Sequence, residues 1–281
     1  MEDPMVITWW NGLCLVAFFN ICLLILAYRI YTKKKNEMSA DMKKIRSWQV
    51  ALATIYTLGC GFRSILPRGD LRRIVLVDSW ISSVVIGRTV ATIAELSFVA
   101  QWSFILFEAG KNTGNKSIQL LAKIPFPMIV IAELFSWYAC TTTNYIGSAI
   151  EESLWALAAG ITVYGFYLAR NYYENEQRRF LNQGMLAGIL YCIYMVFVDV
   201  PAYISKWSAS EAADRTYNTV GEGLNEVCTQ WTLTRAYGDW QYEMIWMSLY
   251  FSIAVWMSIY LINAPKLDKN LKQKKVIYKS Y

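Results

Sequence analysis

The sequence predicts an all-α polytopic integral membrane protein, a seven-transmembrane-helix bundle, on the basis of three observations. Hydrophobic residues make up 56% of the chain and aromatic residues 15%, which is unlike an ordinary soluble domain. Apolar runs of about 20 residues recur along the chain, and this is the length that a helix needs to cross the hydrocarbon core of a bilayer. Tryptophan and tyrosine gather near the ends of these runs, because amphipathic rings prefer the headgroup level.

Seven apolar runs follow one another along the chain. The first begins behind Glu2 and Asp3, and this acidic front, together with the length of the run, argues against a signal peptide. The third is unusually long and predicts a central, tilted helix. We therefore expect one transmembrane domain at residues 1–265 and a basic tail at 266–281. The runs cover about 6–30, 48–66, 76–108, 122–143, 151–170, 184–205 and 242–263.

Lysine and arginine lie mainly in alternate connections, and this asymmetry predicts the orientation of the chain. With the N-terminus outside, the inner segments hold most of the cations, including those at 33–35, 43–46 and in the tail. The prediction is therefore N-out/C-in. We attribute the net charge of +6 mostly to cations that contact the surface of the lipid bilayer and its anionic lipids. We expect no nucleic-acid partner.

Three of the six cysteines fall at or beyond the predicted outer ends of the spans. They are Cys60, Cys140 and Cys228. One disulfide among them is compatible with an oxidising outer side, but nothing in the sequence fixes the pairing.

Four arginines surround Asp70 in the predicted outer loop between the second and third spans. They are Arg63, Arg68, Arg72 and Arg73. Cations are unusual on the outer side, so two interpretations arise. The arginines either form a docking point for an anionic headgroup or phosphate, or simply anchor the loop to outer-leaflet phosphates.

The connection at 206–241 is too long for a bare loop in a compact domain. Apolar residues recur in it at helical spacing, which predicts an amphipathic helix across the outer mouth of the bundle. Gly221 and Gly223 interrupt this pattern. The helix is either a lid over a pocket or an interfacial helix with a packing role. The residues at helical spacing are Tyr217, Val220, Leu224, Val227 or Cys228, and Trp231.

The third span carries Arg88 and Glu95 near the middle of the bilayer. Residues separated by three, four or seven positions share a helix face. One stripe therefore contains both charges with Thr92, and its outer continuation contains Asp78 and Ser82. We expect this stripe to face the bundle interior, and Val84, Ile86, Val90, Ile93 and Phe104 to lie on the opposite face.

A charge at bilayer depth costs at least about 2.5–3.5 kcal/mol, so the stripe requires partners or water. Glu133 in the fourth span and Asp199 in the sixth lie at suitable depths, and Arg88 is expected to pair with Asp199 or Glu95. We therefore predict a polar intramembrane site for a ligand. Its members are Arg88, Thr92, Glu95, Glu133, Tyr194 and Asp199.

Several classes of chemistry are disfavoured. The chain contains no histidine, which removes histidine-ligated haem and di-iron, the usual zinc hydrolase site and the Ser-His-Asp triad. A retinal pigment requires a lysine inside a span, usually the last, and residues 242–263 contain none. We expect no metal and no cofactor. Glu151 and Glu152 are interpreted as acids at a helix N-terminus.

Three functional hypotheses remain. The first is a multi-pass membrane protein that recognises or transports a small or lipid-like ligand in its polar interior. The second is an accessory or structural subunit of a larger membrane protein complex, in which the buried charges specify helix packing. The third is a membrane enzyme acting on lipid headgroups without histidine, although no nucleophile and base occur at a recognisable spacing.

Overall fold

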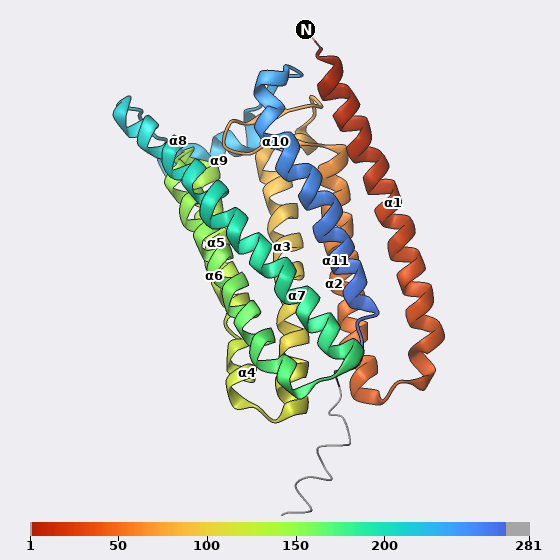
Figure 1. Cartoon of the computed structure of the whole chain (residues 1–281). Coiled ribbons are helices and arrows are strands. Elements are labelled where there is room, and N and C mark those ends of the chain that lie inside the picture. Colours follow the sequence, from red (N-terminus) through yellow and green to blue (C-terminus); the bar gives the residue numbers. More distant parts are fainter. Residues whose placement is uncertain (1, 268–281) are drawn as a thin grey trace, which may run out of the picture.

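The chain folds into a bundle of long helices, described for residues 2–267 in a computed structural model (Figure 1). The long helical segments are α1 (Pro4–Lys34), α2 (Ala40–Ile65), α3 (Val84–Thr113), α5 (Pro125–Thr142), α6 (Tyr145–Ala169), α7 (Asn175–Tyr194) continued by α8 (Val200–Ala212), and α10 (Tyr237–Leu249) continued by α11 (Val255–Ile262). Short elements connect them: 3₁₀ turns at Lys35–Glu37, Trp80–Ser82 and Arg170–Tyr172, and α4 (Lys116–Leu121) and α9 (Val220–Thr229). The predicted basic tail lies outside the described residues from residue 268 onward.

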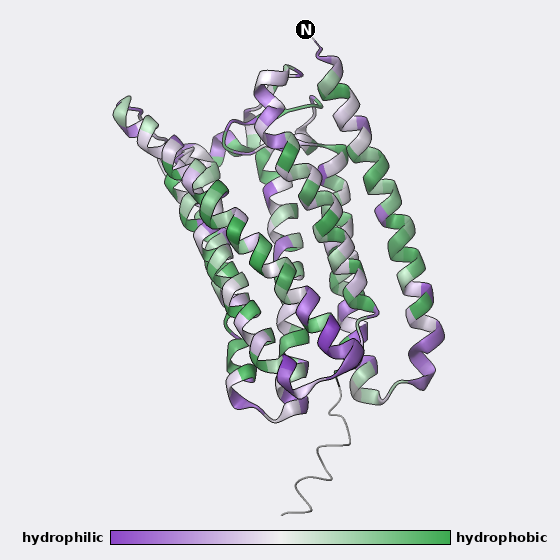
Figure 2. Ribbon diagram, in the orientation of Figure 1, coloured by the Kyte–Doolittle hydropathy of each residue, from purple (hydrophilic) through white to green (hydrophobic). Residues whose placement is uncertain are grey.

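Five of these segments are long and apolar enough to cross a membrane, which indicates a multi-pass integral membrane protein. They are Pro4–Glu37, Val84–Thr113, Lys116–Thr142, Asn175–Ala212 and Tyr237–Ile262. Helices α2 and α6 are similar in length, with 26 and 25 residues, and pack among the five. Figure 2 shows hydrophobic residues along the middle of the bundle and hydrophilic residues concentrated at its lower end.

Helix α3 begins at Val84, eight residues later than the sequence pattern suggested. The residues before it form a loop, because Ser79 caps the short turn at Trp80–Ser82 and Ser83 is extended. Asp78 and Ser82 therefore do not belong to the polar face of the helix. Val84 lies on the apolar face that was expected to meet other helices or lipid, and it is fully buried, whereas Ile93 and Phe104 on that face are exposed.

A small three-stranded sheet closes the end of the bundle at which the chain begins (Figure 1). Strands β1 (Arg68–Gly69) and β2 (Ile74–Val75) pair antiparallel, and β3 (Thr232–Leu233) adds to β2 in parallel. The sheet joins the loop before α3 to the connection before α10. This pairing holds Asp70 and its neighbouring arginines above the start of α3.

The predicted helix across the outer mouth is shorter than expected. Helix α8 continues to Ala212, and only Val220–Thr229 form the separate helix α9, which starts with a capping box between Thr219 and Glu222. Its buried residues are Gly223 and Val227, while Val220 and Leu224 are exposed. A Cβ at Gly223 would lie 2.1 Å from the carbonyl oxygen of Thr141, so this glycine permits close contact with the end of α5.

Two helices contain a π-helical turn where α-helix was expected throughout. One joins α7 to α8 at Met195–Asp199, and the other joins α10 to α11 at Tyr250–Ala254. Such turns leave backbone carbonyls without the usual partner. At the second turn, buried Asn20 of α1 supplies one, because its amide nitrogen donates to the Phe251 carbonyl at 2.8 Å.

Candidate functional site

The candidate site is a buried group of charges around Arg88, one turn into α3. Its Nη2 donates to Glu95 Oε2 and Glu133 Oε2, each at 2.8 Å, and lies 3.6 Å from Glu151 Oε1. Its Nη1 lies 3.9 Å from Asp70 Oδ2. We call Arg88, Asp70, Glu95, Glu133 and Glu151 the Arg88 cluster. The predicted pair of Arg88 with Glu95 is present, and Glu133 joins the same nitrogen.

Four separate segments bring the cluster together. Arg88 and Glu95 share the inner face of α3 through their spacing of seven residues. Glu133 comes from α5 and Glu151 from α6, and these helices form a tight hairpin through Thr143 and Asn144. The hairpin brings α5 and α6 so close that a Cβ at Gly147 would lie 2.8 Å from the Phe135 carbonyl oxygen. This close packing turns Glu151 toward α3.

Further charged groups cover the cluster from the end of the bundle that the small sheet closes. Arg68 donates through Nε to Asp70 at 2.5 Å and through Nη1 to the Ser83 carbonyl at 2.9 Å. Arg63, at the end of α2, lies 3.6 Å from the other oxygen of Asp70. Burial alone would raise the pKa of Asp70, but Arg68, Arg63 and Arg88 together hold it below its ordinary value. Burial lowers the pKa of Arg68 to about 10, which leaves it charged at neutral pH.

Gly87 makes the position of Arg68 sterically possible. A Cβ at residue 87 would lie 1.2 Å from Arg68 Nη1, so the guanidinium group rests directly on the backbone of α3. Only glycine leaves that space open.

Hydroxyl and indole groups support the carboxylates. Thr92 donates to Glu133 Oε2 at 2.6 Å, and Trp137 donates in turn to the hydroxyl of Thr92 at 3.2 Å. Tyr250, the first residue of the second π turn, donates to Glu95 Oε1 at 3.3 Å. The predicted site residues Arg88, Thr92, Glu95 and Glu133 are therefore brought together by direct contacts.

The cluster and its outer shell contain more acid than base. Asp70, Glu95, Glu133 and Glu151 face Arg63, Arg68 and Arg88, so one carboxylate has no cationic counterpart. Among the described residues, Glu133 Oε1 is buried and has no hydrogen-bond partner. Carboxylates crowded together in a poorly hydrated interior cannot all remain charged unless cations or hydrogen-bond donors compensate each of them.

The three glutamates also satisfy the geometric requirement for holding a cation. One oxygen from each of Glu95, Glu133 and Glu151 lies within 4.8 Å of the other two. Nitrogen Nη2 of Arg88 is already close to all three, however, and occupies the position that a metal ion would need. Metal binding would therefore require the guanidinium group to move. A proton requires no such displacement.

Asp199 and Tyr194 do not join the cluster. The expected pair of Arg88 with Asp199 is not formed, because Asp199 ends the π turn between α7 and α8 and is partly exposed. The charges near Asp199 include those of Glu152, Lys206 and Glu243. The Lys206 ammonium lies over three tyrosine rings, at 5.8 Å from Tyr145, 5.2 Å from Tyr203 and 5.7 Å from Tyr242.

The outer arginines contact protein groups. Arg63 and Arg68 are buried and bind Asp70, so they are inaccessible to a lipid headgroup in this structure. Arg73 binds Glu226 of α9 and the Thr141 carbonyl. Arg72 binds the Asp239 carbonyl, and its side chain is 33% exposed. The headgroup interpretation thus remains a prediction for Arg72 and Arg73.

Cys60, Cys140 and Cys228 are free thiols in the structure. Cys140 and Cys228 pack in one small apolar cluster with Val84 and Val227, whereas Cys60 lies in the large core. The structure thus brings Cys140 and Cys228 into one neighbourhood, and the disulfide remains a prediction.

Glu151 and Asp70 are site residues that the sequence interpretation missed. Glu151 was assigned to a helix N-terminus, because the fifth apolar run was taken to begin at residue 151. Helix α6 instead begins at Tyr145, with Asn144 accepting a hydrogen bond from the Ile146 amide. Asn144 followed by Gly147 and Ser148 was the available signal, since an asparagine cap places Glu151 almost two turns inside the helix.

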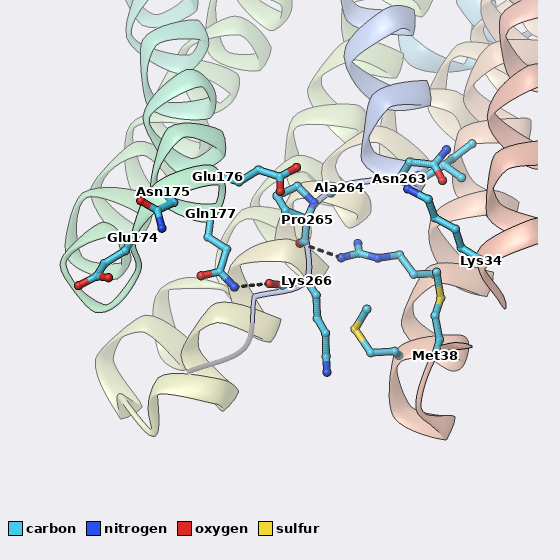
Figure 3. Close-up of a pocket in the computed structure, with 13 residues that line it drawn as sticks. Lys34, Met38, Glu174, Asn175, Glu176, Gln177, Asn263, Ala264, Pro265 and Lys266 are labelled. Atoms are coloured by element: carbon cyan, nitrogen blue, oxygen red, sulfur yellow. Dashed lines mark hydrogen bonds between the residues drawn. The ribbon is translucent and has the colours of Figure 1, made fainter. Parts of the chain in front are cut away.

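A separate hollow lies at the opposite end of the bundle, where α1 ends and α2 begins (Figure 3). Its volume is about 490 Å³, and Arg46, Lys34 and Lys266 line it together with Glu174 and Glu176. It contains none of the predicted ligand-binding residues.

Comparisons with known proteins give no match. Neither a family model, nor a curated protein, nor a solved structure is significantly similar to this chain. The functional argument therefore rests on the geometry of the chain.

Proposed function

We propose that this protein is a seven-helix membrane protein, N-out/C-in, that recognises or transports a small or lipid-like ligand through a polar site in its outer half. Helices α2 and α6 supply the sixth and seventh spans beside the five apolar segments. The asymmetric distribution of lysine and arginine supports the orientation.

The observation that carries this proposal is the unmatched carboxylate of the Arg88 cluster. Ion pairs that only hold helices together are expected to be balanced, because each unpaired buried charge costs several kcal/mol. Here Glu133 keeps a buried oxygen without a hydrogen-bond partner. A proton taken up by the three glutamates, or a cationic group of a ligand, would neutralise the excess charge. We therefore assign the cluster to proton-linked or cation-linked ligand binding.

We infer that a ligand reaches the cluster from the side on which α8 and α10 lie, because Tyr250, which follows α10, contacts Glu95. Glu152, Asp199 and Glu243 add acidic groups on this side, and each is partly exposed. Lys206 and its three tyrosines stand at the outer end of the same region. A ligand would pass this lysine before reaching Glu95 and Tyr250.

Infrared difference spectroscopy of the purified full chain tests the proposal, with the proton itself as the probe. In the wild type, a change from acidic to basic pH should remove a protonated-carboxyl band. In Glu95→Gln this band should weaken or shift, because the substitution removes one of the coupled carboxyl groups while conserving size. Glu211→Gln, which alters an exposed acid at the end of α8, is the control and should leave the band unchanged.

Absence of any protonated-carboxyl band in the wild type would overturn the proposed role of the cluster. Native mass spectrometry of the protein extracted gently from its membrane then identifies what it carries. A defined lipid or metabolite that disappears in Glu95→Gln supports ligand recognition.

An accessory subunit of a larger complex is the second candidate, and the exposure of α7 and α8 favours it. Only 11% of the apolar stretch in this segment is buried, and Phe197 is 75% exposed. Such a surface suits a partner helix as well as lipid. Stoichiometric partner subunits in the same mass spectra would support this candidate, and the Arg88 cluster would then be scaffold.

A further inference from the structure

The hollow at the opposite end of the bundle has the size and the donors of a ligand site. Four segments border it: the end of α1, the start of α2, the start of α7 and the residues after α11. Its volume of about 490 Å³ lies within the range of small-molecule pockets. Under the proposed orientation, it opens toward the inner leaflet.

Arg46 gives this pocket a fixed cation. Its side chain is only 1% exposed, and it is held by Glu108 at 3.6 Å and by the Pro265 carbonyl, to which Nη2 donates at 3.2 Å. Within residues 2–267, Nη1 of the same guanidinium group has no hydrogen-bond partner. A buried guanidinium nitrogen that lacks an acceptor is costly, and an anionic group in the adjoining pocket would offset the charge of Arg46 electrostatically.

The remaining charges are separated across the pocket. Lys34 and Lys266 add two cations to Arg46, while Glu174 and Glu176 at the start of α7 supply two acids. Figure 3 shows Lys34 on the side of α1 and Glu174 on the opposite side, on the segment that leads into α7, with Lys266 between them. A ligand of a single charge would be repelled by one wall.

We propose that this pocket binds a zwitterionic phosphate ester with a primary amine, of the phosphoethanolamine type. The phosphate oxygens accept hydrogen bonds from the ammonium groups of Lys34 and Lys266, and the buried Arg46 guanidinium group adds positive charge behind them. The amine lies against the carboxylates of Glu174 and Glu176. This chemistry occurs in a free phosphate ester and in a lipid headgroup, and basic pockets between helix ends are typical headgroup sites.

Isothermal titration calorimetry of the full chain, purified in detergent free of phosphatidylethanolamine, tests the proposal. The probes are O-phosphoethanolamine, inorganic phosphate and ethanolamine. We expect the first to bind at least tenfold more tightly than either of the others, because only it satisfies both walls.

Substitutions then separate the two walls. The double variant Lys34→Gln with Lys266→Gln should weaken both O-phosphoethanolamine and inorganic phosphate at least tenfold. Glu176→Gln should weaken O-phosphoethanolamine but leave inorganic phosphate unchanged or bound more tightly. Lys33→Gln is the matched control, because Lys33 is exposed, neighbours Lys34 in sequence and does not line the pocket. None of these variants alters the buried Arg46, and thermal unfolding of each variant checks that it is folded.

The source of the ligand is distinguished in nanodiscs. If the headgroup of a lipid is bound, phosphatidylethanolamine should compete with O-phosphoethanolamine, and phosphatidylglycerol should not. If a soluble ester is bound, neither lipid should compete. The proposal is overturned if O-phosphoethanolamine does not bind, or if it binds with the same affinity to the wild type and to the double lysine variant.

Discussion

Two levels of α3 handle buried polarity in different ways. Near its start, Arg88 and Glu95 belong to a charged cluster with an excess of acid. Near its middle, Gln101 forms a neutral network with Gln49 of α2 and Ser258 of α11. The Gln101 amide donates to two backbone carbonyls and accepts from the Ser258 hydroxyl at 2.5 Å.

The difference between these regions separates packing from function. Neutral amides reciprocally bonded between helices specify their register at modest cost, which is a common way to hold membrane helices together. The charged cluster costs far more to bury and retains a carboxylate without a counter-charge. A protein that needed only adhesion between helices could have used amides at both levels.

The largest effect is expected for Arg88→Ala. The substitution leaves four acids around an empty space, and breaking a buried charge pair on one side typically costs about 3–5 kcal/mol. We expect a strong loss of folded protein, measured by fluorescence-detected size-exclusion chromatography of membrane extracts. Arg215→Ala, at an exposed arginine, should elute as the wild type does. Equal yields for both variants would mean that the cluster does not hold the outer half together.

Gly87→Ala should be nearly as severe, at about 3 kcal/mol, because the new Cβ would overlap Arg68 Nη1 and push a buried charge away from Asp70. Thermal unfolding in detergent measures this effect. Gly61→Ala is the matched control, since no atom lies within 4 Å of its added Cβ. A melting temperature for Gly87→Ala as high as that of the control would show that Arg68 is not confined by the backbone of α3.

Gln101→Leu tests the neutral network and should cost less, about 1–2 kcal/mol, as expected for a few lost hydrogen bonds. Thermal unfolding again measures the effect. The protonated-carboxyl band of the cluster should persist in this variant. Loss of that band would show that the two levels of α3 act as one unit and would remove the distinction drawn above.

The smallest expected effect is the loss of the contribution of Asp70 to the free energy of unfolding when the protein is acidified. The pKa of Asp70 is lower in the folded protein than in the unfolded chain, so its contribution to stability is complete above its ordinary pKa of about 4 and is lost as pH falls through the folded value. Asp70→Asn should melt lower at neutral pH and lose less stability on acidification. An unchanged acid dependence in this variant would contradict the ion pairs with Arg63 and Arg68.

The sequence was sufficient for the membrane class, the approximate helix positions and the central part of the site. Apolar run length and the spacing of seven residues between Arg88 and Glu95 carry that information directly. Depth in the membrane also pointed correctly to Glu133. The predicted start of the third span was wrong by eight residues, because the loop before α3 gives no sign in hydropathy that the helix has not yet started.

Contacts between segments were the part that sequence could not supply. Asp70 reaches Arg88 only because the small sheet folds the loop back over α3. Glu151 reaches Arg88 because the connection between α5 and α6 is shorter than the apolar runs suggested. Asp199 was expected at the depth of Arg88, but it ends the π turn on the α8 side and does not pair with Arg88. Depth alone does not determine which side chains meet.

The two π-helical turns have a consequence for the evolution and engineering of this chain. Each adds one residue to a helical turn, so the segment beyond it is rotated by about 100° relative to an uninterrupted helix. Removing a single residue from Met195–Asp199 or Tyr250–Ala254 would restore a regular helix without shortening the span appreciably. It would also rotate the outer ends, with Lys206 on one helix and Tyr242 on the other, to new faces. A single-residue change at Met195–Asp199 would reorient Lys206 relative to α7, whereas one at Tyr250–Ala254 would also displace Phe251 and Trp240, which are buried in the core.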